Sequence, residues 1–209
     1  MSQRGVPQWL KWAREIQALS QNIRTFAANE YDVQNADNLA GVAAEIVASH
    51  SQLPVTQTLE NFKVQPGYAT PKVDVRAAIV RDGKILLVQE SADRRWCMPG
   101  GWADVGKRPA EMVIREVDEE SGFQVEPRKV VAVIDANRGG EPMEFYHAYK
   151  VIWLCDIVGG ESRTSHETLA VEFFDFDVLP PLSLHRTNQA MLAEVRAHLD
   201  DPLRPVAFD

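Results

Sequence analysis

The sequence predicts an α+β fold, or helices and a mixed sheet in α/β/α layers, with a small helical domain at the N-terminus. Near the N-terminus, apolar side chains recur at three- and four-residue steps, which is the period of an amphipathic helix. From Lys72 onward they alternate with polar residues, as they do in a half-buried strand. A helical pattern then returns between strand candidates, so helices are expected to cover the sheet.

The N-terminal helical domain is expected to span residues 1–67. Its first helix is predicted within 7–27, after a proline suited to a first helical position, and its second within 35–51. The apolar stripe of the first helix consists of Trp9, Trp12, Ile16, Leu19 and Ile23. Because a helix pair of this size buries little apolar surface alone, we expect it to pack on the rest of the chain or on a second copy, and we predict a homodimer.

The second domain is expected to span residues 68–209 and to begin with a hairpin. Asp82-Gly83 separates the alternating run from the apolar run 84–90, which is a strong signal for a two-residue turn. Further strands are predicted at 129–136, 144–157 and 170–176, and a last helix at Thr187–His198. Between the second and third strands a helix is expected from Pro109 to Ser121, ended by Gly122.

Composition excludes several classes of protein. With 45% hydrophobic and 25% charged residues the chain can bury a core, and a net charge of −8 disfavours sequence-independent binding of nucleic acid. No apolar run is longer than Val151 to Cys155, which is far shorter than the ~20 residues that cross a bilayer, so no membrane segment is expected. Cys97 and Cys155 have no disulfide or zinc-ligand spacing, and a reducing cytoplasm fits best.

Three carboxylates gather on the predicted helix that follows a glycine-rich loop. Glu116, Glu119 and Glu120 fall within one arc of about 100°, where they repel one another. They lie toward the helix C-terminus, where the helix dipole disfavours negative charge. An acidic face in contact with solvent is one reading of such a charge run. The other is a site for Mg²⁺ or Mn²⁺, which prefer hard oxygen ligands and would remove the repulsion.

The same segment resembles the Nudix box, a long gapped motif. The match consists of Gly101, Arg115-Glu116-Val117, Glu119-Glu120 and Gly122-Phe123, with the spacing of the motif throughout. The resemblance implies a Nudix-type α/β/α sandwich and a metal-dependent hydrolase that cleaves a nucleoside diphosphate linked to another moiety. One position departs from the motif, because Lys107 stands where the family has its first Glu.

The resemblance extends beyond the box to nearly the whole chain. The stretches WLKWAREIQALSQ, GYATPKVDVRAAI and LPPLSL are similar to a bacterial Nudix subgroup with an N-terminal helical extension. This subgroup includes CDP-choline pyrophosphatases and proteins described as ADP-ribose pyrophosphatases. The resemblance therefore implies a small nucleotide-diphosphate substrate.

The resemblance also implies roles for acidic residues and for the arginine of the box. Glu116, Glu119 and Glu120 would be ligands of Mg²⁺ or Mn²⁺, with Glu119 and Glu120 central to catalysis. Arg115 precedes Glu119 by one helical turn and could pair with it and fix its orientation. Glu90, on the hairpin, could reach the metal. Glu167 would be a further ligand or the general base, and a plain loop glutamate is an equal alternative.

Four residues near the box are candidates for substrate binding. Arg76 could reach the phosphates from the hairpin, and the backbone of Gly100 and Gly101 could supply an amide or carbonyl to the site. Trp102 could stack on a base, although large aromatic side chains are more often packing residues.

The predicted reaction is attack of water on a diphosphate phosphorus, which yields a nucleoside monophosphate and a second phosphorylated product. Because of Lys107, a module that binds nucleotides without cleaving them is an alternative. A pyrophosphohydrolase or nuclease acting on RNA is another, and the lack of a basic stripe weighs against it.

Overall fold

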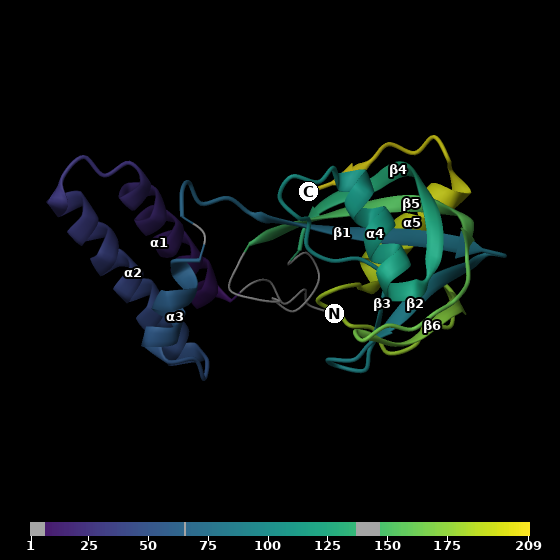
Figure 1. Cartoon of the computed structure of the whole chain (residues 1–209), viewed down its shortest axis with the longest axis horizontal. Helices are drawn as coiled ribbons and strands as arrows, with labels where there is room; N and C mark the ends of the chain where they lie inside the picture. The colour runs from purple at the N-terminus through teal and green to yellow at the C-terminus, as the bar shows by residue number, and fades with distance from the viewer. Residues whose placement is uncertain (1–6, 65, 137–146) are drawn as a thin grey trace. The chain divides into compact units, whose positions relative to one another are not determined.

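The structure, a computed structural model, describes residues 7–64, 66–136 and 147–209. It divides the chain into two compact units, with the division between Pro71 and Lys72 (Figure 1). The unit before the division is helical, and the unit after it contains the sheet. None of the helices in the described ranges is both long enough and apolar enough to cross a membrane.

The helical unit contains α1 (Gln8–Thr25), α2 (Glu30–His50) and α3 (Val55–Phe62). Small residues let α1 and α2 approach closely, and the Ser20 hydroxyl donates a hydrogen bond to the Ala36 carbonyl at 2.7 Å. The buried residues of the two helices are Leu10, Ala13, Ser20, Ala36, Ala43, Ala44 and Val47. A helix face beside the predicted stripe therefore forms the contact between α1 and α2.

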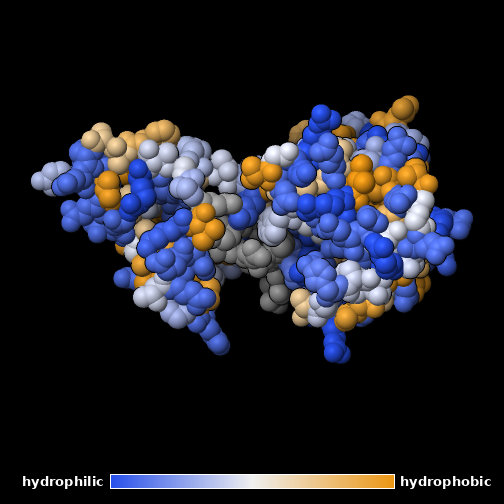
Figure 2. Space-filling model, viewed as in Figure 1, coloured by the Kyte–Doolittle hydropathy of each residue, from blue (hydrophilic) through white to orange (hydrophobic). Residues whose placement is uncertain are grey.

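Part of the predicted stripe of α1 remains exposed. Trp12 is 54% exposed and Leu19, two turns further along, is 51% exposed. Trp9 stacks on His50 with the ring centroids 4.7 Å apart. The surface of this unit that is visible in Figure 2 likewise shows apolar side chains between hydrophilic ones. The unit thus leaves apolar surface of α1 uncovered by its own helices.

The helices of this unit differ from the prediction at two points. Helix α2 begins at Glu30 rather than near residue 35, because the side chain of Asn29 caps it by accepting a hydrogen bond from the Asp32 amide at 3.0 Å. Helix α3 was not predicted.

The second unit is a mixed sheet between helices. Its strands are β1 (Lys72–Arg81), β2 (Lys84–Glu90), β3 (Trp96–Cys97), β4 (Phe123–Asp135), β5 (Ala148–Gly160), β6 (Thr168–Asp175) and β7 (Ala207–Phe208). The order is β3-β2-β1-β5-β4-β7, and β6 pairs with the β2 strand. The β1–β5 and β4–β7 pairs are parallel and the others antiparallel, which confirms the predicted mixed sheet.

Helices α4 (Pro109–Ser121) and α5 (Gln189–Asp200) cover the two faces of the sheet (Figure 1). Val75 and Ala77 of β1 pack in a core with Val113 and Val117 of α4. Ala78 belongs to the opposite core, which contains Met191, Leu192 and Val195 of α5. Because successive side chains of a strand point to opposite faces, this division confirms the α/β/α layers.

The predicted hairpin is present, and the box helix has the predicted bounds. Asp82 and Gly83 have φ of 52° and 74°, as a type I′ turn requires, and Arg81 pairs with Lys84 across it.

The other strands are less well predicted. Strand β4 begins at Phe123 rather than at 129, because register shifts at three points, one beside Pro127, break the alternation of apolar residues.

The remaining differences concern strand and helix ends. Strand β5 runs over Ala148–Gly160 instead of 144–157, and residues 144–146 of the predicted strand lie outside the described residues. Helix α5 begins at Gln189, after the side chain of Asn188 caps it by accepting from the Met191 amide at 3.0 Å. The short strands β3 and β7 were not predicted.

Candidate active site

The glycine-rich loop between β3 and α4 pairs with β1 as a strand would. The amides of Ala77 and Val75 donate to the carbonyls of Pro99 and Gly101, each at 2.8 Å. Gly100 has φ of 144°, and a Cβ there would lie 2.0 Å from the Val75 carbonyl oxygen. Glycine is therefore required at this position by both the backbone conformation and the contact with β1.

The loop also contacts two of the three carboxylates of α4. The Gly100 amide donates to Oε2 of Glu120 at 2.8 Å. A Cβ on Gly101 would lie 2.8 Å from Oε2 of Glu116, so this glycine leaves room for the carboxylate. The two glycines therefore help to position Glu116 and Glu120, and their predicted part in substrate binding stays a prediction.

Burial makes the carboxylate environment unusual. Glu120 is 6% exposed, and its burial, together with the charges of Glu90 and Glu116, raises its pKa to about 8 despite the opposing effects of Arg76 and the Gly100 amide. Burial likewise raises the pKa of Glu116, against the effect of Arg115. At both residues burial therefore disfavours the ionised carboxylate, and a further positive charge nearby would favour it.

Arg115 connects three carboxylates. Its Nη1 lies 2.7 Å from Oδ2 of Asp104, its Nη2 lies 3.2 Å from Oε1 of Glu116, and its Nε lies 3.5 Å from Oε1 of Glu119. The expected contact with Glu119 is present, and the contact with Asp104 is shorter. The hydrogen bonds that Arg115 donates to Asp104 and Glu116 raise its pKa. Arg115 is thus placed to orient two candidate ligands.

The exposed Lys107, which replaces the motif glutamate, lies in the loop before α4, where its amide donates to the Asp104 carbonyl at 3.3 Å. The side chain of Asp104 supplies a carboxylate to Arg115. Glu111 instead accepts from the Arg108 amide at 3.3 Å at the start of the helix. The negative charge beside Arg115 therefore comes from Asp104 in this loop.

Glu90 lies near the carboxylates of α4 but has partners of its own. It is 7% exposed, accepts a hydrogen bond from the Cys97 thiol at 3.1 Å, and lies 3.4 Å from Nε of Arg186. Arg186 was missed in the sequence because it lies in an irregular loop with no ligand spacing. The predicted role of Glu90 as a metal ligand would require it to exchange Arg186 for the ion.

Arg76 is buried with partners of its own, and its predicted contact with substrate phosphates, which would require it to leave them, stays a prediction. Arg76 is 3% exposed, and its Nε and Nη2 donate to Asp74 at 2.8 and 2.9 Å, while its Nη1 donates to the Met98 carbonyl at 3.2 Å. Lys150 of β5 also reaches Asp74, at 3.3 Å. Arg76 therefore holds the segment before the glycine loop, and its burial could not be read from the strand pattern.

The charges of the buried residues Asp74, Arg76 and Lys150 shift one another's pKa. Burial would raise the pKa of Asp74, but the charges of Arg76 and Lys150 hold it below its usual value. Burial, together with Arg76, lowers the pKa of Lys150 to about 8, although Asp74 opposes the shift. Asp74 thus compensates two buried cations beneath the site.

Trp102 is at the surface of the sheet unit. It is 38% exposed, and Nζ of Lys72 lies 5.9 Å from its ring centroid. Stacking of Trp102 on a base stays a prediction.

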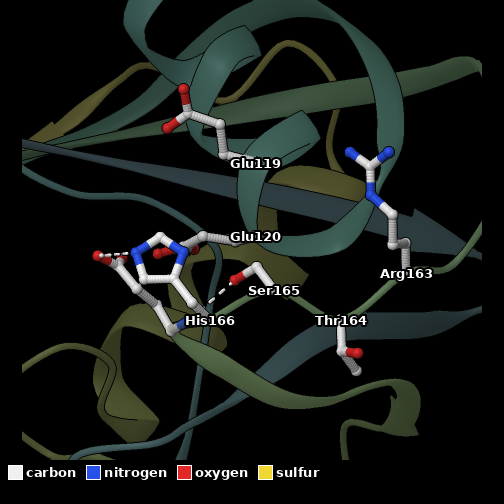
Figure 3. Close-up of a pocket in the computed structure, with 7 residues that line it drawn as sticks. Glu119, Glu120, Arg163, Thr164, Ser165 and His166 are labelled. Atoms are coloured by element: carbon white, nitrogen blue, oxygen red, sulfur yellow. Dashed lines mark hydrogen bonds and ion pairs between the residues drawn. The ribbon is translucent and has the colours of Figure 1, made fainter.

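A cleft of about 380 Å³ lies between the end of α4 and the loop before β6. Glu119 and Glu120 line it from the helix, and residues 163–167 line it from the loop (Figure 3). Glu167, predicted as a further ligand or the general base, lies in this loop, and its Oε1 is 3.3 Å from Nε2 of His166. The rest of the loop was missed because its contacts are with residues far away in the sequence.

The carboxylates of α4 fit a divalent cation by their chemistry. In the part of the chain that the structure describes, no three carboxylate, imidazole or thiol groups are arranged to hold an ion. Arg115 and the Gly100 amide are instead the partners of the three glutamates. Three hard oxygen ligands within two helical turns nevertheless suit Mg²⁺ or Mn²⁺, and a cation would favour the ionised forms that burial disfavours.

An α/β/α sandwich with a glycine loop beside clustered carboxylates on α4 defines a pyrophosphohydrolase of the Nudix class. Family comparison agrees: residues 70–195 match the NUDIX domain, and residues 7–62 match a UDP-X-like, N-terminal oligomerisation domain. The chain belongs to the Nudix family.

Three relatives are similar to the chain over most of their own length. YjhB of Bacillus subtilis, to which ADP-ribose pyrophosphatase activity is provisionally assigned, is 36% identical over 96% of this chain and 97% of its own. The crystal structure of a UDP-X diphosphatase is 29% identical, with a TM-score of 0.63, over 96% of this chain and 98% of the other. An ADP-ribose pyrophosphatase from Streptococcus suis is 41% identical, with a TM-score of 0.62, over 67% of this chain and 100% of the other.

Replacing Asp74 tests the buried charge group. We expect Asp74→Asn to lower the free energy of unfolding by about 3–5 kcal/mol, because Arg76 and Lys150 would stay buried without their carboxylate. The matched control is Asp156→Asn, which removes an exposed ion pair with Arg128 and should cost about 1 kcal/mol or less. Denaturant titration of both variants measures the difference, and equal losses would contradict this account.

Charge changes near Arg115 test the role of Asp104. We expect Asp104→Asn to lower kcat by about 2–5-fold, because it removes a partly exposed ion pair that helps to orient the carboxylates. Lys107→Glu should raise kcat by about the same small factor and leave metal affinity nearly unchanged. Glu111→Gln is the control and should leave kcat unchanged. Steady-state kinetics on the best substrate gives the comparison, and a larger loss in the control would refute it.

Proposed function

We propose that this enzyme hydrolyses the diphosphate of a small nucleotide linked to a second moiety, of the ADP-ribose, UDP-linked or CDP-choline type, with Mg²⁺ or Mn²⁺. The observation that carries the proposal is the contact of the glycine loop with Glu116 and Glu120 at a cleft lined by Glu119 and Glu120. The two full-length relatives, one provisionally an ADP-ribose pyrophosphatase and one a UDP-X diphosphatase, support a substrate of this class.

Glu116, Glu119 and Glu120 would hold the cation. When bound, it would neutralise charge on the diphosphate oxygens and lower the pKa of water. Arg115 orients Glu116 and Glu119, and the Gly100 amide fixes the carboxylate of Glu120. Glu167, across the cleft, would accept the proton of the attacking water. The oxygen of this water bonds to one phosphorus as the bridging P–O bond breaks, so the products are a nucleoside monophosphate and a second phosphate ester.

A panel of substrates tests the proposal. It contains ADP-ribose, UDP-sugars, CDP-choline, NADH, diadenosine polyphosphates and 5′-capped or 5′-triphosphate RNA, each assayed with Mg²⁺ and Mn²⁺, with products identified by chromatography. We expect cleavage of a small nucleoside diphosphate derivative to a nucleoside monophosphate. Cleavage of RNA alone would support the RNA-directed alternative, and tight binding without cleavage would support a nucleotide-binding module.

Removal of the metal or of its ligands tests the mechanism. We expect EDTA to abolish turnover and Glu119→Gln to lower kcat by about 10²-fold or more without unfolding the protein, because the carboxylate would no longer hold the cation. Glu126→Gln, an exposed glutamate on β4, is the control and should retain full activity. Full turnover in EDTA would disprove the proposed mechanism.

We propose that the helical unit forms a homodimer. The match of residues 7–62 to an oligomerisation domain and the exposure of Trp12 and Leu19 on α1 support this. An apolar helix face of this kind is commonly covered in an oligomer.

Light scattering after gel filtration tests the homodimer. We expect a dimer of the full chain at micromolar concentration, and we expect Trp12→Glu with Leu19→Glu to give a monomer, because charges would replace apolar contact surface. Tyr31→Glu is the control, since Tyr31 is 78% exposed on α2 outside the stripe, and it should remain dimeric. A monomeric full-length chain would contradict the proposal.

A further inference from the structure

Thr168, the first residue of β6, connects the acidic helix to the opposite wall of the cleft. It is 1% exposed, and its hydroxyl donates a hydrogen bond to the main-chain carbonyl of Glu120 at 2.8 Å. Glu120 lies in the last turn of α4. The main-chain carbonyls of a last turn have no amide partner within the helix and need partners from elsewhere. Thr168 supplies that partner from a residue 48 positions later in the chain.

The same hydroxyl oxygen organises the loop that carries Glu167. It accepts a hydrogen bond from the Ser165 amide at 3.0 Å and lies 3.1 Å from the Ser165 hydroxyl oxygen. The Ser165 hydroxyl oxygen in turn accepts from the Glu167 amide at 3.1 Å. A short series of hydrogen bonds thus leads from the carbonyl of Glu120 through Thr168 and Ser165 to the backbone of Glu167.

Other contacts fix the two ends of this loop. The Arg163 amide donates to the Ser121 carbonyl at 2.8 Å, and the Ser91 amide donates to the Glu167 carbonyl at 2.8 Å. The first bond holds the beginning of the loop on α4, and the second holds its end on the chain after β2. Directly after the second point, the side chain of Thr168 provides the contact to Glu120.

We propose that Thr168 is a positioning residue that sets the distance between Glu167 and the carboxylates of α4. This inference rests on the proposed function, in which Glu119, Glu120 and Glu167 act on one substrate in the cleft that they line. A misplacement of about 1 Å can cost roughly 10²-fold in rate, so a single hydrogen bond at this point has a measurable effect. Thr168 acts through Glu167 and does not itself touch the substrate.

Thr168→Val removes the hydroxyl at nearly constant volume, and Thr168→Ser retains it. We expect the valine variant to lower kcat by about 10–100-fold with KM changed by less than about threefold, because the geometry is lost while the substrate contacts remain. The serine variant should stay within about threefold of the wild type in kcat. Equal losses in both variants, or full activity of the valine variant, would overturn the proposal.

A control and a double-mutant cycle separate positioning from a general loss of stability. Thr58→Val removes a similar buried hydroxyl, which donates to the Pro54 carbonyl at 3.1 Å in the helical unit, and it should leave kcat unchanged. In a Glu167→Gln background, Thr168→Val should have little further effect on kcat, because both changes remove the contribution of one positioned group. Additive losses in this cycle would overturn the proposal.

Amide hydrogen exchange gives a readout that needs no substrate. Exchange at Ser165 and Glu167 should be faster in Thr168→Val and unchanged in Thr168→Ser and Thr58→Val. Unchanged exchange in the valine variant overturns the inference whatever the activity. If exchange changes as expected but the wild type hydrolyses none of the nucleotides tested, the proposed function fails and the positioning role of Thr168 in the loop stands.

Discussion

The contact of two glycines with the carboxylates of Glu116 and Glu120 is the constraint on which the rest of the site depends. At Gly101 a side chain would displace the carboxylate of Glu116, and the Gly100 amide donates a hydrogen bond to Glu120. The backbone of the loop pairs with β1, and this pairing fixes the position of the two glycines. The position of the carboxylates is therefore set by strand β1 as much as by their own helix.

Two groups of charged residues near the site differ in how completely opposite charges within the protein compensate them. Beneath the loop, Asp74 lies between Arg76 and Lys150, so this buried group has its countercharges within the protein. Above the loop, the buried Glu120 and the partly buried Glu116 have a raised pKa, and Arg115 is shared among several carboxylates. A site for a cation needs carboxylates whose negative charge is not fully paired with positive side chains. If every carboxylate were paired within the protein, a bound cation would have no charge to neutralise.

Local signals in the sequence predicted the parts of the fold that local interactions determine. The Asp82-Gly83 turn and the helix from Pro109 to Ser121 were correct because turn and capping residues act over a few positions. Strand β4 was only partly predicted because its bulges interrupt the two-residue period, and helix α3 was missed. Periodicity describes an element only where the element is regular.

The sequence indicated the candidate site where the motif lies and missed the contacts between distant segments, and the roles of the site residues stay predictions. The acidic residues of α4 follow from spacing alone, whereas the contact of Glu90 with Arg186 and the cleft wall at residues 163–167 come from pairings across the fold. The burial of Arg76 was not predicted, because a strand pattern does not tell which of its polar residues will be buried with partners of their own.

Gly122 ends α4 with φ of 77°, and a Cβ there would lie 2.4 Å from the carbonyl oxygen of Glu161. The last glycine of the motif therefore serves a segment far outside the motif, because it lets the loop before β6 lie directly on the end of the helix. Moving residues 99–123 as a cassette into an unrelated scaffold would transfer the acidic ligands without the wall that faces them. The motif alone therefore does not form the cleft, because the opposite wall comes from other parts of the sheet unit.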